Sequence, residues 1–314
     1  MSADIATLVH TSGAEARVLV SQGFNCFAWS AVVQDGVRPM LYAPEGFESG
    51  DQRASSGGTP ILFPFPGRIE QGRYEYAGKQ YQVPAGDALG NAIHGFVFNR
   101  PWRVVDQSSD QVTAEFVGSV DAPDTLDLWP SDYAIRATYR LEGDRLTLDV
   151  TCSNPGDSEL PYGLATHAYF RLPLGGGDPE QTEVQAPVDA QWELKDMIPT
   201  GEHGPTDASR GFAAGMPLAG QAYDSAFRLN QSASGEATSS LSGDGVRLTQ
   251  TCGDEFKCYV IYTPGHREAI CIEPYTCLPS PFGSAARGAE TNLLVLQPGE
   301  SRQHRVVLQV EAAG

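Results

Sequence analysis

The chain has 314 residues, of which 41% are hydrophobic, so it can bury a substantial core and does not have the composition of a disordered chain. It carries 39 acidic and 21 basic residues, a formal net charge of -18, and the acidic excess is spread along the chain. This balance argues against nucleic acid and anionic membranes as partners, because both require a basic surface.

Short runs in which apolar and polar residues alternate, as is typical of β-strands, occur along the whole chain. In chain order, the clearest of them are 17–20, 133–139, 145–150, 293–296 and 304–310. Turn-forming residues separate such runs at 77–79, 142–144, 154–156 and 298–300. No long stretch has the spacing of an amphipathic helix. The sequence therefore predicts an all-β protein made of antiparallel sheets packed face to face.

A polar stretch at 230–240, NQSASGEATSS, is the nearest approach to a linker. Strand-like runs continue on both sides, so we interpret it as a loop between two strands and predict a single domain over residues 1–314. The N-terminus lacks the basic and apolar segments of a signal peptide, and no apolar run is long enough to cross a membrane. We therefore expect a cytoplasmic protein.

The six cysteines show no C-x-x-C spacing, which zinc sites and redox motifs would require. Several lie in apolar runs, where cysteine commonly serves as a small buried hydrophobe, so we do not expect a disulfide framework. The sequence also contains no phosphate-binding loop, no dinucleotide fingerprint and no cluster with metal-ligand spacing. We accordingly predict neither a cofactor nor a metal.

The most informative stretch is AICIEPYTCLPSPF at 269–282. Alternation along a strand places Ile270 and Ile272 on one face, whereas the other face carries small residues and ends in Glu273 and a phenol. A bulky face opposite a small face that ends in a carboxylate is typical of a strand that borders a pocket. Glu273 is therefore a candidate site residue, although it could simply accept backbone hydrogen bonds at a strand end.

A second stretch, PYGLATHAYFRL at 161–172, has the same layout. Leu164 and Phe170 share one face, and His167 follows small residues on the other. We expect the strands that carry Glu273 and His167 to supply opposite walls of one groove. A single histidine in an apolar run is more often structural, so the combination with Glu273 is what favours a site.

Three further polar residues stand in apolar or turn-rich surroundings. His94 lies in NAIHGFVFNRPW, Arg68 near the end of the proline-broken run GGTPILFPFPGRI, and Asp224 in YDSAF. Each has a structural alternative, namely a satisfied buried histidine, an ion-pair partner and a turn residue. The site hypothesis fails only if all of these alternatives hold together.

Taken in order, these residues resemble the aldose 1-epimerase (galactose mutarotase) family. The motifs that carry the resemblance are PFPGRI at 64–69, GKQY at 78–81, HG at 94–95 with Trp102, PSDY at 130–133, Asn154 with HAYFRL at 167–172, and EPY at 273–275. Their order and approximate spacing extend over nearly the whole chain. One departure is Gly67, because many galactose-active members have asparagine immediately before the Arg–Ile pair.

The resemblance implies a large antiparallel β-supersandwich with a sugar site in a groove on one sheet. It also implies a cofactor-independent isomerase that interconverts the α and β anomers of an aldose, with Glu273 as the base at the C1 hydroxyl and His167 as the acid at the ring oxygen. Arg68, His94 and Asp224 would bind the monosaccharide, beside an aromatic residue that we do not identify. We expect a monomer or homodimer.

The same scheme sets an expectation for protonation. Partial burial should raise the pKa of Glu273 towards neutrality, and His167 can be protonated with that carboxylate nearby.

Three alternatives stay open. A hexose-6-phosphate 1-epimerase would need extra basic residues such as Arg100 and Arg103, although the net charge of -18 argues against it. A non-catalytic sugar-binding protein would not need an acid–base pair. A glycosidase would need a second carboxylate, for which Asp224 is the candidate, at a distance that the sequence does not give.

Overall fold

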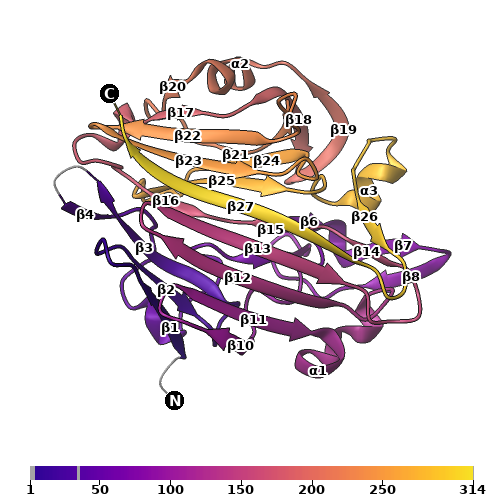
Figure 1. Ribbon diagram of the computed structural model, residues 1–314. Coiled ribbons are helices and arrows are strands. Elements are labelled where there is room, and N and C mark those ends of the chain that lie inside the picture. The colour runs from indigo at the N-terminus through magenta and orange to yellow at the C-terminus, as the bar shows by residue number, and fades with distance from the viewer. Residues whose placement is uncertain (1–3, 34–35, 314) are drawn as a thin grey trace.

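The computed structural model describes residues 4–33 and 36–313. In these residues strands predominate and form two large antiparallel sheets and several small ones. Figure 1 shows β27 running across the front of the larger sheet, with strands of the second sheet behind it and α2 at the top. The prediction of an all-β antiparallel architecture is confirmed.

The larger sheet has nine strands, each antiparallel to its neighbours. At the centre of the sheet, every residue of β13 pairs with a residue of β27. Apolar residues alternate with polar ones in both strands, so the apolar side chains gather on one face of the sheet. In sheet order the strands are β10 (Arg103–Gln107), β11 (Gln111–Val117), β12 (Ala134–Glu142), β13 (Arg145–Ser153), β27 (Ser301–Ala312), β23 (Val246–Cys252), β22 (Ala237–Gly243), β17 (Glu183–Gln185) and β20 (Met216–Pro217).

The second sheet has eight strands, and it positions most of the residues discussed below. Its order is β19 (Ile198–Gly204), β18 (Val188–Lys195), β21 (Asp224–Leu229), β24 (Cys258–Tyr262), β25 (Ala269–Tyr275), β15 (Ala165–Thr166) and β5 (Ile61–Leu62). The eighth strand, β16 (Tyr169–Arg171), also pairs with β25. The short β5 lies at the edge of the sheet, which suits the proline-rich segment that contains it.

The remaining elements are small. Four N-terminal strands form their own sheet, and three pairs of strands form two-stranded sheets: β1 (Ile5–Val9), β2 (Glu15–Leu19), β3 (Asn25–Val33), β4 (Gly36–Pro39); β14 (Leu160–Tyr162) with β26 (Leu294–Leu296), β6 (Arg68–Ile69) with β9 (Ala92–Ile93), and β7 (Arg73–Tyr76) with β8 (Lys79–Gln82). The helices are α1 (Gly118–Asp121), α2 (Asp207–Ala214) and α3 (Pro281–Ala286), with 3-10 turns η1 (Phe47–Ser49), η2 (Glu70–Gly72), η3 (Pro123–Leu128) and η4 (Pro179–Gln181).

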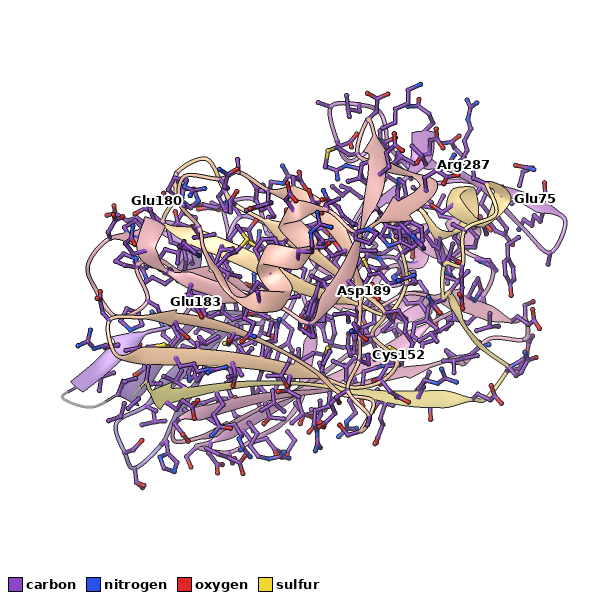
Figure 2. All side chains as sticks on the ribbon, turned by 90° about the horizontal axis from the view of Figure 1, so that it is seen from above. Glu75, Cys152, Glu180, Glu183, Asp189 and Arg287 are labelled. Atoms are coloured by element: carbon purple, nitrogen blue, oxygen red, sulfur yellow. The ribbon has the colours of Figure 1, made fainter. Side chains whose placement is uncertain are left out.

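A continuous cluster of buried apolar side chains connects the two large sheets. It includes Leu148 from β13, Val306 from β27 and Ile270 from β25. Figure 2 shows side chains filling the layers, with Cys152 among them and Glu75 at one end of the molecule. All six cysteines are buried and unpaired, which confirms the expectation that they form no disulfide framework.

The predicted loop at 230–240 ends earlier than expected. Strand β22 begins at Ala237, which is buried and pairs with Cys252 of β23. The loop does connect two strands, as predicted, but burial of its last residues against the neighbouring strand overrides their polar composition. The single domain over residues 1–314 stays a prediction.

Among the described residues, no helix has the length and apolar character needed to span a bilayer.

Candidate active site

Strand β25 has a core face and a cavity face. All seven of its residues are buried, and it pairs with β24 on one side and with β15 and β16 on the other. Ile270 and Ile272 belong to the main apolar cluster, whereas Glu273 and Tyr275 line a cavity of about 510 Å³. The two faces predicted from alternation are therefore present.

His167 lies beside Glu273 rather than across a groove from it. Ala165 pairs with Tyr275 and Tyr169 pairs with Cys271, so the same register places His167 opposite Glu273 in the gap between β15 and β16. The His167 Nε2 and Glu273 Oε1 atoms are 3.4 Å apart. The expectation of opposite walls was wrong, because both side chains rise from one face of the same sheet.

The same face continues across β24 and β21. Tyr262 pairs with Cys271, and Asp224 pairs with Tyr262, so alternation brings the side chains of Tyr262 and Asp224 onto the face that carries Glu273. Both line the cavity. The floor of the cavity is therefore one face of the eight-stranded sheet, built from strands far apart in the chain.

The small sheet of β6 and β9 supplies Arg68, and His94 directly follows β9. Arg68 pairs with Ile93 in this sheet, and the His94 backbone N–H donates to the Gly67 carbonyl at 2.8 Å. The Arg68 Nε donates to Asp87 Oδ2 at 3.0 Å, and both Arg68 and His94 line the cavity. The structure thus brings all five predicted site residues to one cavity.

Burial dominates the electrostatics of Glu273, whose side chain is only 2% exposed. Removal from water raises its pKa well above the usual range, and the negative charge of Asp224 raises it further. The hydrogen bond from Tyr275 and the positive charge of Arg68 act in the opposite direction. The predicted direction for Glu273 agrees with its environment.

The surroundings of His167 favour its neutral form in the resting protein. Burial lowers its pKa to about 3, because the enclosed ring loses the hydration that stabilises imidazolium. The raised pKa of Glu273 and the lowered pKa of His167 both favour the form of the pair in which Glu273 holds the proton. The His167 Nδ1 is buried without a hydrogen-bond partner in the described residues, and the ring stacks on Tyr169 at 4.8 Å.

Asp224 and His94 differ in exposure but both have perturbed pKa values. Asp224 is open to solvent, yet the surrounding cavity walls desolvate its carboxylate enough to raise its pKa, against the opposing charge of Arg68. His94 is buried, which lowers its pKa well below the usual value, and nearby His167, Arg68 and Arg53 lower it further. His94 is therefore neutral and suited to hydrogen bonding rather than to carrying charge.

Several cavity residues were missed by the sequence analysis. The aromatic residue expected beside a sugar has four candidates in the lining, namely Tyr42, Tyr169, Tyr262 and Tyr275. Arg53 also lines the cavity, where its Nε donates to Ser55 Oγ at 3.0 Å and no described carboxylate pairs with it. Arg53 stands in a turn-rich segment with no periodic pattern, so no signal in the sequence distinguished it.

Arg100 and Arg103 do not reach the cavity. Their ion pairs are with Asp124 at 2.6 Å and with Asp121 at 2.9 Å, and neither arginine lines the cavity. The two arginines considered for phosphate binding are therefore neutralised elsewhere on the surface.

One group of potential metal ligands occurs among the described residues. His167, Cys271 and Glu273 are all buried and place one ligand atom each within 4.8 Å of one another. The set includes both members of the histidine–carboxylate pair, so a bound metal would occupy the atoms that otherwise exchange protons.

Comparisons with known proteins agree with this architecture. The family model described as Aldose 1-epimerase matches residues 32–309. The Escherichia coli K12 protein named Uncharacterized protein YihR is 25% identical, over 80% of this chain and 77% of that protein. Mouse galactose mutarotase is 27% identical, over 45% of this chain and 41% of its own length. A galactose mutarotase-like protein from Clostridium acetobutylicum superposes with a TM-score of 0.81 at 21% identity, covering 99% of both chains.

Proposed function

The chain belongs to the aldose 1-epimerase family, and on that premise we propose that it interconverts the α and β anomers of an aldose by opening and reclosing the sugar ring. The observation that carries the proposal is the pair formed by His167 and Glu273, 3.4 Å apart in a cavity of about 510 Å³. The hydroxyl oxygen and the ring oxygen of a cyclic aldose are bonded to the same carbon, C1. Two groups this close can therefore serve both oxygens at once.

The reaction moves one proton into the pair and one out of it. The pair reacts from its ionised form, in which the proton has moved from Glu273 to His167 across the 3.4 Å between them. Glu273 then takes the proton of the C1 hydroxyl while His167 gives its proton to the ring oxygen, and the bond between C1 and the ring oxygen breaks. Opening leaves Glu273 protonated and His167 neutral, which is the arrangement that burial favours. After the aldehyde rotates, both transfers reverse and the ring closes on the other face.

The other predicted residues bind the sugar. Arg68 is fixed by Asp87, so its remaining N–H groups are oriented donors for sugar hydroxyls. Asp224 accepts hydroxyl hydrogens on the same side, and neutral His94 lies beside His167 with ring centroids 5.6 Å apart. Tyr262, whose ring lies edge-on to that of His167 at 6.3 Å, is the aromatic side chain best placed beside the sugar.

The direct test is the rate of anomer exchange, measured by NMR exchange spectroscopy or polarimetry across a panel of aldoses. We expect exchange above the spontaneous rate for at least one sugar. Binding of a sugar without accelerated exchange would instead identify a sugar-binding protein. Release of a free sugar from a glycoside would identify a glycosidase, which would make Asp224 the second carboxylate.

A second candidate, a 1-epimerase for hexoses with an acidic group such as a phosphate, is favoured by Arg53 alone. This guanidinium lines the cavity without a carboxylate partner in the described residues. Its positive charge lowers the pKa of both His94 and His167. If an acidic group is recognised there, Arg53→Gln will reduce exchange of hexose 6-phosphates about tenfold or more and spare neutral hexoses. Equal effects on both classes would remove this candidate.

A further inference from the structure

The two carboxylate oxygens of Glu273 have different surroundings. Oε1 lies 3.4 Å from His167 Nε2, whereas Oε2 accepts a hydrogen bond from the Tyr275 hydroxyl at 3.1 Å. Tyr275 is itself only 2% exposed, and its ring packs with Leu62, Ala165 and other buried side chains. One oxygen is thus held by a fixed donor, and the other faces the histidine.

The position of the Tyr275 ring depends on a missing side chain. Gly67 has φ +64°, and a Cβ built there would lie 2.9 Å from the Pro279 Cβ and 3.3 Å from the Tyr275 Cε2. The first distance is closer than real Cβ atoms approach, and a positive φ disfavours any residue with a side chain. Glycine at this position therefore leaves room for Pro279 and for the edge of the Tyr275 ring, both of which a side chain at 67 would crowd.

Resting on the proposed function, we propose that Tyr275 is a positioning residue. Its hydroxyl holds Oε2 of Glu273, so that Oε1 is the oxygen that takes the proton from the sugar, and Gly67 provides the space that allows this contact. The glycine at position 67 and the phenol at position 275 are then two parts of one arrangement. Glu273, Tyr275 and Gly67 all line the cavity.

Several other groups also act on Glu273, and none of them replaces the Tyr275 contact. The charged or titratable groups nearest to it are His167, Asp224 of β21 and Arg68 of β6. The remaining titratable neighbours on β16, β24 and β25 are phenols and thiols whose pKa values are raised by burial, so they stay neutral: Tyr169, Tyr262, Cys258 and Cys271. Tyr275 is the neighbour whose hydroxyl donates a hydrogen bond to Oε2.

Removing the hydroxyl has two consequences of known sign. A hydrogen bond donated to a carboxylate stabilises the ionised form, so its loss raises the pKa of Glu273. Ring opening requires ionised Glu273 beside protonated His167. When the pKa of Glu273 rises, a smaller fraction of the pairs that hold one proton are in this reactive form. The alkaline limb of the kcat/KM profile, where the pair loses its only proton, moves to higher pH, while the plateau rate decreases.

The test is the titration of the Glu273 carboxyl carbon by 13C NMR in the full-length protein without sugar, assigned with Glu273→Gln. In Tyr275→Phe we expect the midpoint to rise by about one pH unit, with the alkaline limb of kcat/KM rising equally and its plateau falling about tenfold. The matched control is Tyr162→Phe, which removes a buried hydroxyl that contacts His304 Nε2 at 2.9 Å, and neither residue lines the cavity. It should change neither the midpoint nor the limb.

Gly67→Ala tests the second half of the proposal. A methyl group there should displace the ring and shift the carboxyl midpoint in the same direction as Tyr275→Phe. In the double variant the two shifts should not add, because both act through one hydrogen bond. An unchanged midpoint in Tyr275→Phe, or additive shifts, would overturn the proposal. The titration needs no sugar, so it gives a result even if anomer exchange is absent.

Discussion

The protein contains two buried clusters of the same three residue types, with opposite properties. In the cavity cluster, Tyr275 contacts Glu273, which lies 3.4 Å from His167. In the second cluster, His304 of β27 binds Glu255 through Nδ1 at 2.9 Å and Tyr162 through Nε2 at 2.9 Å.

The difference lies in how completely each histidine is satisfied. Both ring nitrogens of His304 have hydrogen-bond partners. Although burial raises the pKa of Glu255, the hydrogen bond from His304 and other contacts lower it overall. His167 has a buried Nδ1 without a partner in the described residues, and its carboxylate neighbour has a raised pKa. A satisfied cluster stabilises a fold, whereas an unsatisfied one next to a cavity is poised for a ligand.

The strongest contrast should come from the two glutamates. Glu273→Gln removes the proposed base and should reduce anomer exchange by at least about a hundredfold. Glu255→Gln should leave exchange near the wild-type rate but lower stability by about 1.5 kcal/mol, because it weakens a partly buried hydrogen bond to a carboxylate. Exchange rates by NMR and chemical denaturation of both variants check this. An active, folded Glu273→Gln variant would remove Glu273 from the base role.

Glu273→Gln should also stabilise the protein, with a defined pH dependence. The unfolded chain releases the Glu273 proton above about pH 4.3, whereas the folded chain retains it, so wild-type stability falls as the pH rises from that value towards the raised pKa. Glutamine does not titrate, so the variant does not lose this stability as the pH rises. The Tm advantage of the variant should be absent near pH 4 and should grow as the pH rises towards the raised pKa of Glu273.

The next largest difference should be between substitutions of the two histidines. His167→Asn is expected to lower kcat strongly with a smaller change in KM, because it removes the proposed acid and keeps most of the cavity. His304→Asn should leave kcat unchanged and reduce Tm, since it breaks hydrogen bonds to both Glu255 and Tyr162. Steady-state kinetics and thermal melts distinguish them, and a wild-type kcat in His167→Asn would contradict the assignment.

The smallest expected effect is that of metal removal. Dialysis against EDTA should leave anomer exchange unchanged, because proton transfer by the proposed pair needs no metal. Loss of activity that zinc restores would show instead that His167, Cys271 and Glu273 hold a required ion. Cys271→Ala separates the two cases, since it removes one ligand and leaves the acid–base pair in place.

Features that depend on local sequence were predictable. The two faces of β25 follow from period-two alternation, which involves only neighbouring residues. The strand positions of β12, β13 and β27 follow for the same reason. The cavity as a shared location for Glu273 and His167 was also anticipated, since each follows small residues on one strand face.

Features that depend on register were not predictable. That His167 lies beside Glu273 follows from the pairing of Ala165 with Tyr275 and of Tyr169 with Cys271, which links segments about a hundred residues apart. The neutral state of His167 depends in turn on how deeply this pairing buries the ring. Tyr262 was missed because its position in the cavity is set by such long-range pairing. Arg53 was missed because it lies outside any strand, in a turn-rich segment.

Some residues that carried the family resemblance are structural. The Asn154 side chain donates to the Leu296 carbonyl at 2.9 Å, and the Trp102 indole donates to the Val97 carbonyl at 3.1 Å. Tyr81 stacks on Tyr74 at 4.9 Å. A resemblance in sequence therefore combines residues that hold the sheets together with residues that line the cavity, and only the structure separates the two.

The burial of β25 has a consequence for how activity would be lost on heating. Its seven residues are buried and paired on both sides, so its amides should exchange with solvent only when the whole protein opens. The carboxylate is therefore presented by a fully buried strand. Inactivation and global unfolding should then follow the same temperature curve, without an earlier melting of the site.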